Sequence, residues 1–298
     1  MTNCALTLRE FRLSYQVSFK VWKNWPRGRD MPDVDKLREI KKDCVKTLLG
    51  LHKKANSGHI GASLSCLDIL VCLFFDRMKG EDKFILSKGH AATALYAVLA
   101  KSGRMSESEL ESFYKDGTLL AAHPPCSGKL DGVSFGTGSL GHGLSLAAGI
   151  AFSNRFSGRN FNVYCVLSEG DCNEGSTWEA ALFAAHHKIS NLVVIIDNNG
   201  LQGFGKSDDI LGLEPFVKKW ESFNFKVAEA SDGNDFKSLL DAFEKVENGD
   251  DGKPKCIMAK TVKGSGVSFM ENKMEWHYLP MSEDQYGKAV CESGAGNA

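Results

Sequence analysis

The sequence has no long apolar run and almost no net charge. No apolar stretch reaches the about 18 residues that a membrane-spanning helix needs, so we expect no membrane segment. The 36 Lys and Arg residues nearly balance the 37 Asp and Glu residues, which gives a formal net charge of -1. Neither a basic field for nucleic acid nor a polybasic cluster for a membrane surface is present. With 43% hydrophobic residues, the chain is typical of a globular protein with a sizeable core.

The sequence also has no C-x-x-C pair, which argues against a zinc site. Its nine cysteines are an odd number, and several stand within apolar runs. Such cysteines are typical of buried free thiols in a reducing compartment. We therefore expect a cytoplasmic protein.

Residues 1–30 differ in pattern from the rest of the chain. Apolar and polar residues alternate over 11–21, which is a strand signal, and no continuous apolar core of a secretory signal is present. Met31 then opens a conventional start that leads into a helical stripe of apolar residues. Residues 1–30 are thus either an N-terminal extension or an artefact of the assigned start site. Residues 31–298 are expected to form one domain.

After Met31, short apolar runs alternate with helical segments. Expected strands lie at 84–87, 163–167, 192–197, 225–228 and 256–261. Expected helices lie at 33–54, 64–76, 90–102, 106–114, 139–154, 176–188, 214–222 and 234–247. This alternation predicts an α/β fold, doubly wound, with a mainly parallel sheet and helices on both faces.

Polar side chains follow two of these expected strands. Ser168, Glu169, Gly170 and Asp171 follow the strand at 163–167, and Asn199 lies 30 residues beyond Glu169, after the next strand. In a parallel sheet both ends lie at the same edge. Carboxylate, amide and carbonyl oxygens suit Mg²⁺ or Ca²⁺, with open positions for phosphate oxygens. A helix beginning near 176 would point its N–H groups at the same place.

The alternative is a purely structural role, in which these acids only cap a helix and Asn-Asn-Gly only makes a turn. Four histidines in separate loops favour a ligand site instead: His59, His90, His123 and His277. Imidazoles near neutral pKa can donate to oxyanions and can move protons.

One pattern is misleading. Residues 136–141 match the G-x-G-x-x-G fingerprint of dinucleotide sites. No clear apolar strand precedes them, because Asp131 and Gly132 interrupt the segment, and no acidic residue lies about 20 positions on. We therefore reject a dinucleotide site here.

Several motifs occur in an order that resembles one family. They are Ala-Asn-Ser-Gly-His-Ile-Gly at 55–61, Leu-Ser-Lys-Gly-His at 86–90, His-Pro at 123–124, Gly-Ser-Leu-Gly-His-Gly at 138–143 and the acidic stretch at 168–175. Together they resemble the thiamine diphosphate domain of transketolases. More narrowly, the chain resembles the N-terminal subunit of a split, two-chain transketolase. The resemblance covers about residues 33–280.

The resemblance implies thiamine diphosphate as cofactor, with Mg²⁺ (or Ca²⁺) on its diphosphate. Glu169, Asn199 and the carbonyl of Leu201 match the family's metal ligands. Glu169 is one methylene longer than the usual Asp, so either affinity falls or the more permissive Ca²⁺ is favoured. Asp171 is the alternative ligand.

Other roles are implied by matching position. The catalytic set is His59, His123, His277 and Glu174, where His123 would contact the donor's terminal hydroxyl and Glu174 would link two active sites across a subunit interface. The cofactor-binding set is His59, His90, Gly138, Leu140, Gly170, Asp171, Asn199 and His277. Tyr278 stands where Gly is common in the family, which would narrow the substrate channel.

The implied reaction moves a two-carbon ketol unit from a ketose (phosphate) to an aldose (phosphate). The glutamate that activates the cofactor belongs to a pyrimidine-binding domain for which this sequence has no room. We therefore expect a C-terminal transketolase subunit, with a pyrimidine-binding and a C-terminal domain, as obligate partner in a heterotetramer. Apolar faces of the helices at 139–154 and 176–188 are candidate interfaces. The alternatives are a non-catalytic subunit with the same fold, or the α subunit of a 2-oxo-acid dehydrogenase or decarboxylase.

Overall fold

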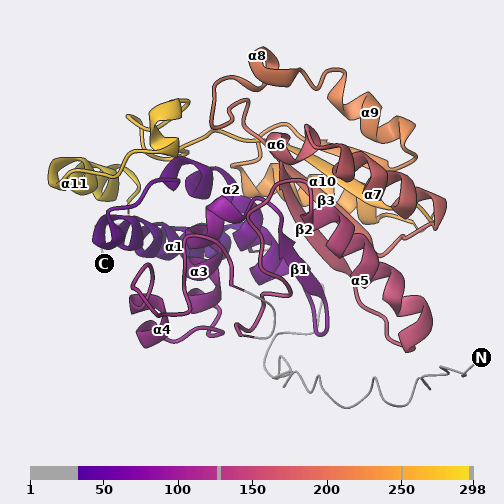
Figure 1. Cartoon of the computed structure of the whole chain (residues 1–298), viewed down its shortest axis with the longest axis horizontal. Coiled ribbons are helices and arrows are strands. Elements are labelled where there is room, and N and C mark those ends of the chain that lie inside the picture. Colours follow the sequence, from indigo (N-terminus) through magenta and orange to yellow (C-terminus); the bar gives the residue numbers. More distant parts are fainter. Residues whose placement is uncertain (1–32, 126–128, 250, 295–298) are drawn as a thin grey trace, which may run out of the picture.

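A computed structural model describes residues 33–125, 129–249 and 251–294. A central sheet lies between two groups of helices (Figure 1). No helix among the described residues is long and apolar enough to cross a membrane. The strand signal in 1–30 lies outside the described residues.

All neighbouring strands of the sheet are parallel, in the order β1-β2-β3-β5-β4. The strands are β1 (Lys83–Leu86), β2 (Val163–Ser168), β3 (Leu192–Asn198), β4 (Lys226–Ala230) and β5 (Lys255–Lys260). All five expected strands are found, with bounds shifted by at most two residues at either end.

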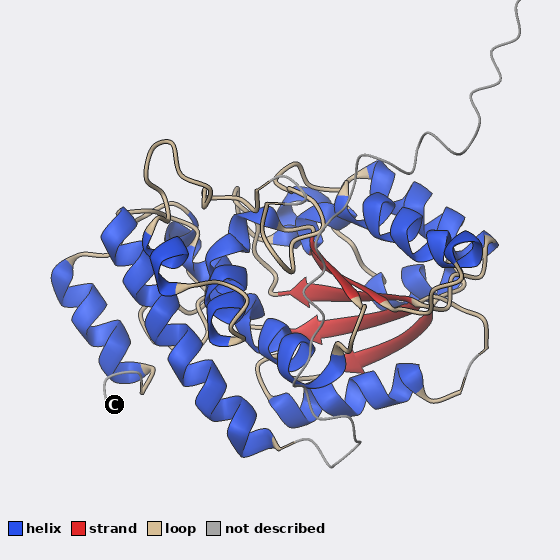
Figure 2. Cartoon of the chain, turned by 90° about the horizontal axis from the view of Figure 1, so that it is seen from below, coloured by secondary structure: helices blue, strands red, loops and turns tan. Residues whose placement is uncertain are grey.

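Each strand contributes alternate residues to two separate cores. On β2, Tyr164 and Val166 pack in one core, while Val163, Cys165 and Leu167 pack in the other. Because side chains alternate across a strand, both faces of the sheet must be covered. Figure 2 shows the strands enclosed by helices. The predicted doubly wound α/β class is confirmed.

The first core is built with α1 (Val34–Ala55), α2 (Ile60–Cys72), α3 (Ala92–Lys101) and α10 (Phe236–Glu247). The second core is built with α5 (Gly143–Ser157), α7 (Gly175–His186) and α9 (Phe216–Ser222). Shorter or peripheral elements are η2 (Leu73–Arg77), η3 (Gly89–Ala91), α4 (Glu107–Glu111), α6 (Glu169–Cys172), α8 (Ser207–Leu211), η4 (Met274–His277) and α11 (Glu283–Glu292).

Two helix predictions need correction, and one helix was not predicted. The helix expected from 139 begins at Gly143, because Gly141 has φ +79° and its backbone cannot continue a right-handed helix. The helix expected over 106–114 is only the five-residue α4. Helix α11 was not predicted, although Ser282 and Gln285 form a capping box at its start.

The cysteine prediction holds for most of the described positions. Six cysteines are buried and free: Cys44, Cys66, Cys72, Cys165, Cys172 and Cys256. Cys291 is free but exposed, and Cys4 and Cys126 lie outside the described residues.

Candidate functional site

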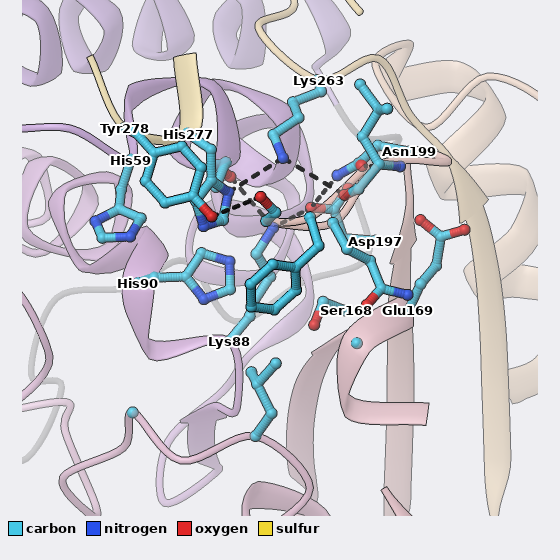
Figure 3. Close-up of a pocket in the computed structure, with 18 of the residues that line it drawn as sticks. His59, Lys88, His90, Ser168, Glu169, Asp197, Asn199, Lys263, His277 and Tyr278 are labelled. Atoms are coloured by element: carbon cyan, nitrogen blue, oxygen red, sulfur yellow. Dashed lines mark hydrogen bonds and ion pairs between the residues drawn. The ribbon is translucent and has the colours of Figure 1, made fainter. Parts of the chain in front are cut away.

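A cavity of about 280 Å³ lies where the carboxyl ends of the strands open into loops. Residues after β1, β2, β3 and β5 line it, together with the loop that ends in His277. This is the edge at which doubly wound sheets bind ligands. Figure 3 shows histidines on one side of the cavity and Glu169 and Asn199 on the other.

The four predicted histidines come together in this cavity. The ring centroid of His59 lies 4.9 Å from that of His277, 5.7 Å from that of His90 and 6.3 Å from that of His123. The rings of His90 and His277 are 5.5 Å apart. Four segments that are distant in sequence therefore present imidazoles to one volume.

Backbone geometry fixes the centre of this cluster. His59 has φ +71°, a left-handed conformation that is uncommon for a residue with a Cβ. Its N–H donates to the carbonyl of His277 at 2.9 Å. Strain of this kind persists where the surrounding structure over-determines it, which is common at functional sites.

All four histidines are held in the neutral form near pH 7. Burial and the nearby Lys263 lower the pKa of His277 to about 3. Burial also lowers the pKa of His59, with a further effect of His123, and burial alone lowers that of His123. Burial and Lys88 lower the pKa of His90 well below its usual value. Neutral imidazoles can each donate one hydrogen bond and accept another.

Oxygen donors face the histidines from the ends of β2 and β3. The Glu169 carboxylate accepts from the Gly200 N–H at 2.7 Å, so it bridges the two strand ends. The Asn199 side-chain oxygen accepts from the Leu201 N–H at 3.0 Å, and its amide donates to Ser65 at 3.0 Å. Burial raises the pKa of Glu169 to about 7, although the hydrogen bond from Gly200 acts in the opposite direction and lowers it. A cation beside this carboxylate would therefore stabilise its ionised form.

One lysine projects between the two sides. Lys263 is 1% exposed, and its ammonium lies 3.2 Å from His277 Nδ1 and 3.5 Å from the Leu201 carbonyl. Burial, together with the Lys88 charge, lowers its pKa to about 8. Within the described residues, no acidic side chain is paired with Lys263 in an ion pair. A buried ammonium in this position favours an anionic ligand.

A second lysine forms the floor of the cavity. Lys88 is 1% exposed and donates to the carboxylate of Asp197, which is fully buried. Asp197 also accepts from Ser65 at 2.7 Å and from Thr261. Burial is the largest single effect and lowers the pKa of Lys88, but Asp197, Cys66 and Asp171 together outweigh it, so the pKa is raised. This buried pair ties β1 and β3 together beneath the site.

The family model for the transketolase thiamine diphosphate binding domain matches residues 34–295. The chain belongs to the transketolase family.

Several transketolase relatives have a similar length. An apulose-4-phosphate transketolase subunit of Actinobacillus succinogenes is 37% identical over 268 residues, which cover 87% of this chain and 96% of that protein. The 6-deoxy-6-sulfo-D-fructose transketolase subunit of a Clostridium species is 34% identical, and the match covers 80% of this chain and 89% of that protein. Human transketolase is 35% identical, and the match covers 88% of this chain but 43% of that protein.

Solved transketolases share the fold. The structure from Campylobacter jejuni matches with a TM-score of 0.77 and 28% identity, covering 86% of this chain and 43% of that chain. The structure from Leishmania mexicana matches with a TM-score of 0.78 and 26% identity, and the match covers 87% of this chain and 41% of that chain. This chain thus spans about two fifths of the length of those transketolases.

Two residues that the transketolase resemblance assigned to the site do not line the cavity. Asp171 is fully buried, and its carboxylate accepts from Ser87 at 2.6 Å, from Gly141 N–H at 2.9 Å and from both Ser168 donors at 2.8 Å. These bonds give Asp171 a structural role in the turn after β2. Glu174 is exposed at the start of α7, beside Gly141.

The remaining predicted positions of this transketolase chain all line the cavity. They are His59, His90, His123, Gly138, Leu140, Glu169, Gly170, Asn199, Leu201 and His277. A Cβ on Gly170 would lie 2.9 Å from the Leu140 side chain, so glycine lets this loop close over the strand end. Lys88, Asp197 and Lys263 were not predicted as site residues, although each lies at or just beyond a strand's carboxyl end.

Proposed function

We propose that this chain is the thiamine diphosphate-binding subunit of a two-chain transketolase. The complex would move a two-carbon ketol unit from a ketose phosphate to an aldose phosphate. Family membership supports this proposal, and so do the names of the relatives of similar length, which are called transketolase subunits. Residues 31–298 would form the thiamine diphosphate-binding domain, and residues 1–30 an extension or start-site artefact.

The observation that carries the proposal is the arrangement of two chemically different walls around one cavity. Neutral imidazoles of His59, His90 and His277 stand on one side, and carboxylate and amide oxygens stand on the other. His123 joins the imidazoles, since its ring lies 6.3 Å from that of His59. The buried ammonium of Lys263 lies between them. An anion such as a diphosphate fits beside the ammonium, and a hydroxylated, neutral carbon chain fits among the imidazoles.

The donor set suits a metal that shares its coordination with phosphate oxygens. Within the described ranges, no three His, Cys, Asp or Glu side chains are grouped to hold a metal ion by themselves. Glu169, the Asn199 oxygen and the Leu201 carbonyl are instead a small set of hard donors at one strand edge. They would hold Mg²⁺ (or Ca²⁺), while Lys263, whose ammonium lies 3.5 Å from the Leu201 carbonyl, would neutralise diphosphate charge.

When bound, thiamine diphosphate supplies the electron sink needed to break and form a carbon–carbon bond beside a carbonyl. The chain's own residues would orient the reactants and move protons. His59 and His277 would contact the diphosphate and the reacting carbonyl, His90 would support the cofactor side, and His123 would contact a donor hydroxyl. Neutral rings suit these roles because each can donate and accept hydrogen bonds without added charge. Gly138, Leu140 and Gly170 would line the cofactor channel.

A partner subunit fits the exposed apolar surface of α5 and α7. On these helices Phe156 is 79% exposed, Leu182 59% and Phe183 39%. Large apolar side chains gathered on neighbouring helices are typical of an interface. We propose that the C-terminal transketolase subunit, with the pyrimidine-binding domain, covers this region in a cytoplasmic heterotetramer, and that the neighbouring Glu174 contacts it.

The test begins with a tagged chain purified together with its partner from the source cell. Thiamine diphosphate binding would be measured with and without Mg²⁺ on the complex, followed by transfer from a ketose phosphate to an aldose phosphate. We expect metal-dependent binding and transfer, with kcat/KM for transfer reduced about 10- to 100-fold in His123→Ala, since losing the partner of a buried hydrogen bond costs about 1–3 kcal/mol. Binding without transfer would indicate a non-catalytic subunit. Release of carbon dioxide from pyruvate, a 2-oxo acid with no hydroxyl beside its carbonyl, would indicate a 2-oxo-acid enzyme instead.

A further inference from the structure

Tyr278 lines the cavity and is held in place at two points, although it is an exposed aromatic residue. Its side chain lines the cavity, and the residue is 53% exposed. Its ring centroid lies 4.9 Å from that of His277. Its hydroxyl donates to the Gly203 carbonyl, with 2.5 Å between the oxygens. The ring is therefore anchored at both ends, by its backbone beside His277 and by its hydroxyl on the loop after β3.

Two glycines permit this anchoring. A Cβ on Gly203 would lie 2.9 Å from the Tyr278 hydroxyl and 3.3 Å from His277 Nε2. A Cβ on Gly58 would lie 2.5 Å from the Tyr278 carbonyl oxygen. A side chain at position 58 would therefore displace the Tyr278 backbone, and one at position 203 would push against the Tyr278 hydroxyl. The loops at 57–59, 199–205 and 274–279 thus meet at one residue.

The position of the anchored ring restricts the route to the histidines. The His277 ring, beside Tyr278, is part of the four-histidine cluster. On the loop that receives the Tyr278 hydroxyl, Phe204 also lines the cavity and is 87% exposed. A group that contacts the His277 imidazole therefore lies close to the Tyr278 ring. Figure 3 shows the Tyr278 ring lying over the histidine side, with its hydroxyl pointing across toward the other wall.

We propose that Tyr278 is a specificity-determining residue that narrows the substrate passage, and that its bond to Gly203 holds it there. This inference rests on the proposed function, because it concerns the donor sugar of that same site. The ring would restrict the carbons beyond the transferred two-carbon unit. A three-carbon donor has little beyond that unit and would pass freely, whereas a longer ketose phosphate would be restricted.

The decisive measurement is a ratio taken within each variant of the complex. We would compare kcat/KM for xylulose 5-phosphate with kcat/KM for hydroxypyruvate, a three-carbon donor whose third carbon leaves as carbon dioxide. Tyr278→Ala should raise this ratio about tenfold, since steric differences of about one carbon are worth about 10- to 200-fold in a tight pocket. A ratio that stays within twofold of the wild type, or falls, overturns the narrowing role. A second variant, Tyr278→Phe, tests the hydroxyl alone. Its matched control is Tyr114→Phe, because Tyr114 is 52% exposed and does not line the cavity.

The anchor itself is tested on the full chain without any activity. In Tyr278→Phe the ring remains but the bond to Gly203 is lost. We expect faster hydrogen exchange in peptides that cover 199–207, and unchanged exchange there in Tyr114→Phe. Unchanged exchange in Tyr278→Phe refutes the anchor. If the wild-type complex transfers from neither donor, the proposed function fails, while the exchange result still decides whether the anchor exists.

Discussion

The buried ion pair beneath the site gives a large and specific stability prediction. Lys88 and Asp197 are 1% and 0% exposed in their side chains, and Lys88 also donates to the Ala62 carbonyl at 3.2 Å. Lys88→Met removes the charge while keeping most of the side chain's length. Asp197 would then be left as a buried carboxylate with no cationic partner, only the hydroxyls of Ser65 and Thr261 and, at 3.5 Å, the Asn199 amide.

The expected cost follows from that uncompensated charge. Removing one partner of a buried pair destabilises a protein by about 3–5 kcal/mol. At about 2 °C per kcal/mol for a chain of this size, the melting temperature should fall by roughly 6–10 °C. Lys101→Met is the matched control, because the Lys101–Asp43 pair is 38% and 53% exposed and should be worth only about 0–1 kcal/mol.

Urea unfolding of the full chain, followed by circular dichroism, measures both variants. The double variant Lys88→Met/Asp197→Leu should be more stable than Lys88→Met alone, because removing the second charge removes the penalty. If Lys88→Met and Lys101→Met differ by less than about 1 kcal/mol, Asp197 does not carry a buried charge that depends on Lys88, and the reasoning is wrong.

Three further predictions follow from close contacts and shifted protonation. Gly143→Ala would place a Cβ 2.3 Å from Ser87 Cβ and should cost about 1–3 kcal/mol in thermal unfolding. Gly149→Ala on the same helix meets open space and should instead gain about 0.5–1 kcal/mol. Burial lowers the pKa of Lys263 to about 8, so between about pH 8 and 10 the unfolded chain binds more protons than the folded chain. The free energy of unfolding of the wild type, measured with urea, should therefore rise over this pH range relative to that of Lys263→Met. Asp171→Asn should cost about 1–3 kcal/mol in urea unfolding, because an amide NH₂ would face donors.

The strands were predictable because they are buried on both faces. Runs such as Val163–Ser168 contain apolar residues without alternation, and the structure divides their side chains between two cores. Helix starts were less predictable, since α5 begins only after the positive φ of Gly141. Helix α11 was missed because its sequence is mostly polar and charged, with only Ala289 fully buried.

The site was predictable to the extent that strand topology controls it. The rule that parallel strands end at one edge placed Glu169 near Asn199, and the Glu169–Gly200 bond joins those two ends. Applied to the end of β5, the same rule would have found Lys263. The role of Asp197 could not be read from its neighbours in sequence, because its partners Lys88 and Ser65 are brought to it only by tertiary packing.

The two acids of the turn after β2 differ in what their oxygens are free to do. Asp171 has a short side chain that points back into the turn, where Ser87, Gly141 and Ser168 supply donors to both carboxylate oxygens. A metal ion at Asp171 would have to displace these bonds in a fully buried position. Glu169 begins two residues earlier, lines the cavity and reaches the Gly200 N–H across the gap between β2 and β3. The shorter side chain therefore holds the turn after β2, and the longer one spans the gap between the two strand ends.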